Sequence, residues 1–210
     1  MNTVLERDQS VVLHNISWNS YQTISDTLQD ETPAHFTYDN GRLEIMVLSL
    51  KHENLKKLLA TLFERLAENL EVEIFAAGST TFRRKDLDRG FEPDECYYIK
   101  HAEIMRGKES VNLDFDPPPD ITIEIDVSHS SINRMKIFAL MGITEVWRYD
   151  GEEVNFFCLS GKEYDKSSES NILTGVRAEK ITELLEGGRS ISQKDFLNTI
   201  EVYSKTLKDD

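Results

Sequence analysis

The sequence predicts an α/β (α+β) protein with a mixed β-sheet flanked by helices, and three observations carry that prediction. Two β-hairpins are indicated by Asn40-Gly41 and Asp150-Gly151, pairs that suit tight turns between strands. A long helix is indicated for 51–70, where leucine recurs at three- and four-residue spacing. A second helix within 128–142 has serines suited to its start and Gly142 suited to its end.

The remaining elements follow along the chain. An N-terminal strand precedes a short helix that opens near Ser17 or Asn19. Further strands are expected at 72–78, 80–84, 91–99 and 120–127. Polar loops are expected at 85–90 and 165–171, and a short helix or turn at 101–108. The chain is expected to end with helices at 181–187 and 192–207. We expect one domain over 1–210, with its core at about 36–159, and with the N-terminal strand and helix (1–30) and C-terminal helices (about 180–206) packed on it.

The composition restricts the function classes. The net charge of −14 does not suit a protein that binds nucleic acid through a generally basic surface. A nucleic-acid role would need a local basic patch, a metal ion or a partner, and we interpret the acidity itself mainly as solubility. Apolar runs are too short to span a bilayer, and the opening residues lack a secretory signal pattern. With only two distant cysteines, the sequence predicts a cytoplasmic protein.

The predicted strand 120–127 has one aliphatic and one acidic face. Its isoleucines and Val127 alternate with four polar residues: Asp120, Thr122, Glu124 and Asp126. The aliphatic face is expected to pack on the 51–70 helix, which leaves the polar face to meet water or cations. Adjacent like charges cost stability, and Mg²⁺ removes that cost by binding one or two carboxylates together with waters and phosphate oxygens. A solvated edge strand is the alternative interpretation.

A second carboxylate stands at the head of a neighbouring strand. Asp94 follows Pro93 in the 91–99 segment, so Asp94 and Glu124 can converge on one ion. This arrangement resembles the PD-(D/E)xK nuclease core. Four segments in order then resemble the Uma2 family, a family of restriction endonuclease-like proteins that was formerly a domain of unknown function: 40–59, 78–99, 118–134 and 139–151. The resemblance extends from about Phe36 to about Leu159.

The resemblance implies a restriction-endonuclease-like core and a specific chemistry. Asp94 and Glu124 would hold a divalent cation, Mg²⁺ or Mn²⁺, for the hydrolysis of DNA phosphodiester bonds. The lysine of the motif is replaced by Asp126, and the alternative lysine position on the following helix, four residues before Phe138, is Arg134. Arginine can stabilise charge on phosphate oxygens through bidentate contacts, but it cannot donate and recover a proton at neutral pH.

Other residues are weaker candidates. Glu44 is the expected third metal ligand, and Asp126 an additional ligand or part of a second metal site. His52, which opens the long helix, is either a catalytic base or a packed or capping residue. Lys136 is the rival of Arg134 as the cation of the site, or a surface lysine. Asp120 is a ligand from the start of its strand or an ordinary turn residue.

Two further expectations concern partners. The basic segment 80–90 carries Arg83, Arg84, Lys85 and Arg89, and is either a phosphate-contacting patch or a solvated loop. A homodimer is expected through the hairpin 146–157, whose aromatic residues would form an exposed surface. The alternative function is a catalytically inactive nuclease fold that serves as a binding or assembly module, with Arg134 ion-paired to Asp126 or Glu124.

Overall fold

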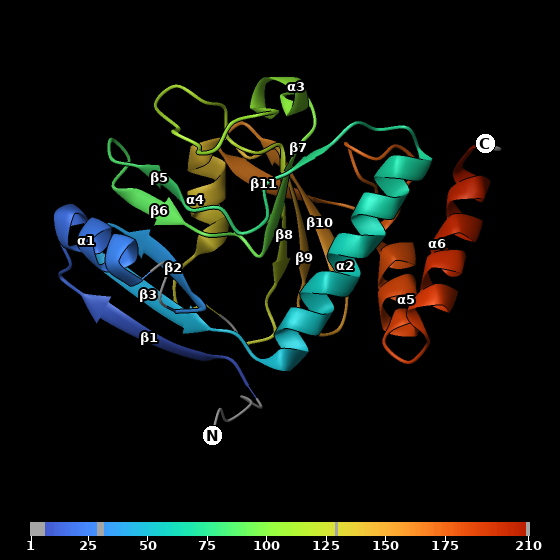
Figure 1. Cartoon of the computed structure of the whole chain (residues 1–210), viewed down its shortest axis with the longest axis horizontal. Coiled ribbons are helices and arrows are strands. Elements are labelled where there is room, and N and C mark those ends of the chain that lie inside the picture. The colour runs from blue at the N-terminus through green and yellow to red at the C-terminus, as the bar shows by residue number, and fades with distance from the viewer. Residues whose placement is uncertain (1–6, 29–31, 129, 209–210) are drawn as a thin grey trace.

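The computed structural model describes residues 7–28, 32–128 and 130–208, which form two β-sheets with helices packed against them (Figure 1). The first sheet is antiparallel, with the strand order β1–β3–β2–β6–β5. It consists of β1 (Gln9–His14), β2 (Ala34–Asp39), β3 (Arg42–Val47), β5 (Phe82–Arg84) and β6 (Arg89–Phe91). Helix α1 (Trp18–Leu28) packs on this N-terminal sheet through Tyr21, which stacks on Tyr38.

The second sheet is mixed, as predicted, with the order β11–β10–β9–β8–β7–β4. Strands β8 and β9 run parallel, and the other neighbours are antiparallel. The strands are β4 (Phe75–Ala76), β7 (Glu95–Tyr98), β8 (Ile121–Ile125), β9 (Glu145–Tyr149), β10 (Val154–Ser160) and β11 (Glu163–Ser167). Strand β8 therefore lies in the middle of the sheet, and the edge-strand alternative is wrong.

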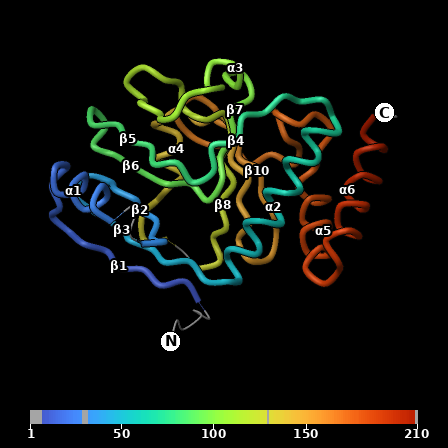
Figure 2. Tube along the Cα trace, viewed as in Figure 1, coloured from blue at the N-terminus to red at the C-terminus, as the bar shows by residue number. Residues whose placement is uncertain are grey.

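Helices cover both faces of this central sheet. Leucines of α2 (Leu50–Asn69) pack on the isoleucines of β8, as the sequence predicted, and α5 (Ala178–Gly188) and α6 (Gln193–Lys208) complete that core. Helix α4 (Arg134–Met141) covers the opposite face, and the short α3 (Ala102–Met105) follows β7. Figure 2 follows the chain from β3 directly into α2, so the start of α2 lies where the two sheets meet. Within the described ranges, no helix combines the length and the hydropathy needed to cross a membrane.

Local turn chemistry explains several boundaries. Asn40 and Gly41 both have positive φ, 46° and 79°, as a tight hairpin turn requires. Gly142 ends α4 in the left-handed region, with φ of 86°. The predicted serine cap of α4 is wrong: the helix begins after Asn133, whose side chain accepts a hydrogen bond from Lys136 N at 3.2 Å.

Four other expectations need correction. The polar face of β8 is not solvated, because α4 lies over it and leaves Thr122 and Glu124 buried. The hairpin 146–157 does not offer an exposed aromatic surface, since Trp147, Tyr149 and Phe156 are buried in the main core. The predicted strand 72–78 is reduced to β4, and part of the predicted polar loop 165–171 belongs to β11.

Candidate active site

The candidate site is a pocket of about 240 Å³ at the end of β8. The segment after β8, the start of α4, and residues of β3, β9 and α2 surround it. Among the described residues, its charged lining comes from five side chains: His52, Glu124, Asp126, Arg134 and Arg148. The pocket therefore contains four of the residues that the sequence singled out, together with an arginine that it did not.

Asp94 lies directly before β7 and is almost completely buried. Its Oδ2 accepts a hydrogen bond from Ile125 N at 2.7 Å, which fixes the carboxylate beside the residue that follows Glu124. Burial alone would raise the pKa of Asp94, but His52, Arg134 and the Ile125 amide together hold it well below its usual range. Asp94 therefore carries a negative charge at neutral pH.

His52 lies in the first turn of α2, where Ser49 caps the helix. Its Nδ1 is 2.9 Å from Asp8 Oδ2, and its Nε2 is 3.1 Å from Asp94 Oδ2. Burial would lower the pKa of His52, but the two carboxylates outweigh it and raise the pKa to about 9. At neutral pH the ring is therefore a cation that orients Asp94. Asp8 was not found from the sequence, because nothing local connects it with a histidine 44 positions later.

Glu124 and Arg134 form a buried ion pair, with 2.7 Å between Glu124 Oε2 and Arg134 Nη1. Arg134 also donates from Nη2 to the backbone oxygen of Glu92. Burial raises the pKa of Glu124 above its usual range, although Arg134 acts in the opposite direction and Asp94 adds to the rise. Among the described residues, neither Glu124 Oε1 nor Arg134 Nε has a hydrogen-bond partner, so each has capacity for a ligand.

These groups fit a divalent cation that takes few protein ligands. Mg²⁺ commonly binds one or two carboxylates and completes its shell with waters and phosphate oxygens. Asp94 and Glu124 provide two neighbouring carboxylates, and Glu124 Oε1 lacks a partner within the described part of the chain. Over the same residues, no group of three or more His, Cys, Asp or Glu side chains is arranged to hold a metal ion. Any cation here would depend on substrate and water for most of its ligands.

Glu44 reaches the site region from the N-terminal sheet. Because strand side chains alternate, Leu43 faces the small core beneath α1 and Glu44 faces the other way. Glu44 accepts hydrogen bonds from Ser130 Oγ and from Ser131 N, the latter at 2.9 Å. Both carboxylate oxygens thus hold the segment that leads into α4. Its role as a third metal ligand stays a prediction.

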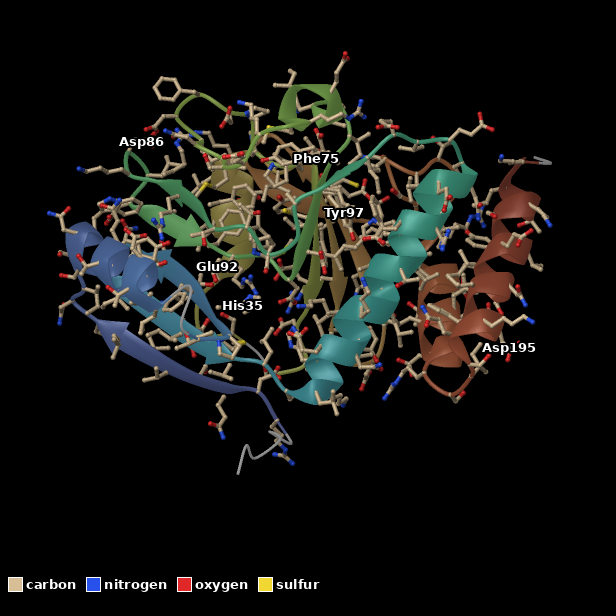
Figure 3. The ribbon with its side chains drawn as sticks, in the orientation of Figure 1. His35, Phe75, Asp86, Glu92, Tyr97 and Asp195 are labelled. Atoms are coloured by element: carbon tan, nitrogen blue, oxygen red, sulfur yellow. The ribbon has the colours of Figure 1, made fainter. Side chains whose placement is uncertain are left out.

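Two more polar residues, the buried Glu92 and the half-buried His35, lie between the sheets and were not found from the sequence. Figure 3 shows His35 and Glu92 in the region between the N-terminal sheet and β8. Glu92 accepts hydrogen bonds from Phe36 N at 3.1 Å and from Thr81 Oγ1 at 2.7 Å. Burial raises the pKa of Glu92 and lowers the pKa of His35, which also senses the charges of Asp94 and Arg134.

The weaker candidates lie elsewhere. Lys136 is exposed and lines a different groove, between α4 and the β10–β11 hairpin, so Arg134 is the α4 cation of the pocket. Asp120 accepts hydrogen bonds from Ile99 N at 2.7 Å and Lys100 N at 3.0 Å, which caps the loop after β7. This matches the turn-residue interpretation of Asp120.

The basic segment 80–90 belongs to the N-terminal sheet. Its arginines make ion pairs with nearby carboxylates: Arg83 with Asp26 at 2.7 Å, Arg84 with Asp86 at 2.6 Å, and Arg89 with Asp39 at 2.9 Å. These pairs reduce the positive charge that the segment offers to a phosphate backbone. Direct phosphate contact by this segment stays a prediction.

Comparison with known proteins agrees with this architecture. A solved structure from Anabaena variabilis ATCC 29413, described as a "putative nuclease belonging to DUF820", matches with a TM-score of 0.52 and 17% sequence identity, over 88% of this chain and 99% of that chain. It shows that the two proteins share a fold, as predicted. A search of curated proteins gave no match. The sequence model of the Uma2 family, described as "Putative restriction endonuclease", matches residues 18–205. Since this match covers most of the sequence, the chain belongs to the Uma2 family.

Proposed function

We propose that the protein is a metal-dependent endonuclease that hydrolyses DNA phosphodiester bonds, with Mg²⁺ or Mn²⁺ as its cation. The observation that carries the proposal is the cluster of Asp94, Glu124 and Arg134: Glu124 and Arg134 line the pocket as an ion pair, and the buried Asp94 lies beside them, where it accepts a hydrogen bond from Ile125 N. The family's description as a restriction endonuclease supports the reaction class and DNA as the substrate.

Each residue has a definite role in this proposal. Asp94 and Glu124 would hold the cation, which would supply Lewis-acid activation of the phosphoryl group. His52 keeps Asp94 ionised and correctly oriented through its contact at 3.1 Å. Arg134 stabilises the negative charge that develops on the phosphoryl oxygens, because a guanidinium makes bidentate, charge-assisted hydrogen bonds to phosphate. Arg134 does not act as an acid or base, since arginine stays protonated.

A plasmid-nicking assay tests the proposal. Purified protein should convert supercoiled DNA to open-circular or linear DNA with Mn²⁺ or Mg²⁺, and EDTA should stop the reaction. Asp94→Asn and Glu124→Gln should each abolish this activity, whereas Glu68→Gln, at an exposed carboxylate on α2, should not change it. Circular dichroism should show that all three variants remain folded. Unchanged nicking by both site variants would refute the assignment.

A second candidate function is a nuclease fold that binds or assembles without cleaving. It is favoured by one observation: Glu124 already pairs with Arg134 and Asp94 already pairs with His52. Under this alternative, titration calorimetry with Mn²⁺ gives no binding heat for the native protein. Under the endonuclease proposal, the native protein binds Mn²⁺ and the Asp94→Asn variant does not. A homodimer and a cytoplasmic location stay predictions.

A further inference from the structure

A polar row crosses the central sheet beneath the start of α4. The strand registers place Glu124 of β8 beside Arg148 of β9, and Arg148 beside Asn155 of β10. On the other side, Glu95 of β7 pairs with Ile123, so Asp94 continues the row next to Glu124. Side chains at paired positions point to the same face of a sheet. Arg148 therefore projects from the same face as the two carboxylates of the proposed active site.

Arg148 completes a pair of guanidinium groups in the pocket. Arg134 enters from α4 and Arg148 from β9, and both line the same 240 Å³ space. Arg148 donates from Nη2 to Asp126 Oδ2, and its side chain remains 34% exposed, compared with 18% for Arg134. Arg134 is thus the less exposed of the two and pairs with Glu124, whereas Arg148 is more accessible to a ligand that enters the pocket.

We infer that Arg148 binds a phosphate group of the nucleic acid, and that Asp126 is the carboxylate with which this phosphate competes. The inference rests on the proposed function and adds a substrate contact to it. The Asp126–Arg148 pair is half-buried, and phosphate also forms strong charge-assisted hydrogen bonds with a guanidinium, so a phosphate group can compete for the same donors. A guanidinium has five N–H donors, and one carboxylate does not use all of them. A phosphate group can therefore begin to bind at the remaining donors of Arg148 before it displaces Asp126.

The two members of the pair have opposite expected effects on binding. We would measure fluorescence anisotropy of a labelled double-stranded oligonucleotide in EDTA, so that binding is observed without cleavage. Arg148→Gln should weaken binding about tenfold, because a charge-assisted contact is lost. The slope of log affinity against log salt concentration should decrease by about one. Asp126→Asn should strengthen binding, because the competing carboxylate is removed. If the ion pair had only a structural role, both substitutions would instead change the affinity for the oligonucleotide in the same direction.

A matched pair on α2 controls for overall charge. Arg65 and Glu68 form an exposed ion pair at 2.7 Å, and Arg65→Gln and Glu68→Gln change the net charge as the two test variants do. Both control variants should leave affinity and salt slope near those of the native protein. Arg148→Lys keeps the charge but loses the fork geometry, so its affinity should lie between those of the native protein and Arg148→Gln. It also provides a test if Arg148→Gln does not fold.

The outcomes separate this inference from the proposed function. If Arg148→Gln binds no more weakly than Arg65→Gln, the role of Arg148 is refuted, even if Asp94→Asn and Glu124→Gln abolish cleavage. If Arg148→Gln shows the expected loss and the native protein never cleaves with Mn²⁺, the phosphate contact stands and the endonuclease proposal fails. If the native protein does not bind the oligonucleotide at low salt, the inference is also refuted.

Discussion

His52 Nε2 lies 3.1 Å from Asp94 Oδ2, which places a cation from the first turn of α2 against a carboxylate at the head of β7. The other ring nitrogen, Nδ1, lies 2.9 Å from Asp8 Oδ2. A histidine between two buried carboxylates is a structural cation, because loss of its proton would remove the positive charge that both carboxylates contact. Asp94 Oδ2 also accepts a hydrogen bond from Ile125 N, so the same carboxylate is attached to the strand that carries Glu124.

The first prediction concerns the pH dependence of this contact in metal-free protein. The pKa of His52 is raised from 6.5 to about 9 by the surrounding carboxylates. Its contribution to stability is therefore complete below pH 6.5 and is lost as the pH rises through about 9. NMR titration of the His52 ring should give a pKa near 9, and Asp8→Asn should lower it. Urea unfolding of the native protein should show reduced stability at pH 9.5 relative to pH 6.5, and His52→Gln should remove most of that difference.

The second prediction distinguishes charge from geometry at Arg134. Arg134→Gln leaves Glu124 buried without a cation and should destabilise the fold by about 3–5 kcal/mol. Arg134→Lys keeps the charge but cannot make both the Glu124 and Glu92 contacts, and should cost about 1.5 kcal/mol. Urea denaturation measures both values. Metal-dependent nicking should follow the same order, and equal losses in the two variants would contradict a role for the positive charge.

The third prediction tests the end of α4. Gly142 has φ of 86°, so Gly142→Ala should destabilise the protein by about 1 kcal/mol. Gly187, in the last turn of α5, meets nothing within 4 Å of an added Cβ, and Gly187→Ala should be neutral or stabilising by up to about 1 kcal/mol. The midpoint temperature of thermal unfolding should therefore fall in Gly142→Ala, and it should stay the same or rise in Gly187→Ala. A loss of equal size in both variants would contradict the backbone argument.

The fourth prediction tests the close approach of α1 to the N-terminal sheet. A Cβ added at Gly90 would lie 2.1 Å from the hydroxyl oxygen of Tyr21, a residue that is completely buried. Gly90→Ala should therefore cost about 1–3 kcal/mol through overpacking. Adding Tyr21→Phe, which removes the clashing oxygen, should recover part of that loss. The thermal midpoints of the two variants give the comparison, and no recovery would mean that the strain lies elsewhere.

The sequence predicted the elements whose patterns are local. The Asn40-Gly41 turn, the leucine stripe of α2 and the alternation of β8 each arise within one segment, and the structure confirms all three. The predicted site residues also proved to be neighbours in two contacts, His52 with Asp94 and Glu124 with Arg134. The resemblance to nuclease motifs grouped Asp94, Glu124 and Arg134 in one site, which periodicity alone could not do.

The remaining features depend on contacts between distant segments. Asp8 and Arg148 have no distinctive local pattern, and only the docking of the two sheets and the register of β8 with β9 bring them to the site. The position of Asp126 illustrates this point. From the sequence, Asp126 was interpreted as an aspartate in place of the motif lysine. In the structure it pairs with Arg148 of the neighbouring strand β9. The serine cap of α4 failed for a similar reason, because Glu44 of the other sheet accepts the hydrogen bond of Ser130.

The charged groups of the proposed site are widely separated along the chain, from Asp8 before β1 to Arg148 in β9, and they meet only where both sheets dock. During synthesis from the N-terminus, His52 and Asp94 emerge well before Glu124, Arg134 and Arg148. A ribosome-bound fragment that ends before β9 therefore lacks Arg148, even if its earlier segments have folded. If the protein cuts DNA, its own order of synthesis delays that activity until the strands of the second sheet have formed.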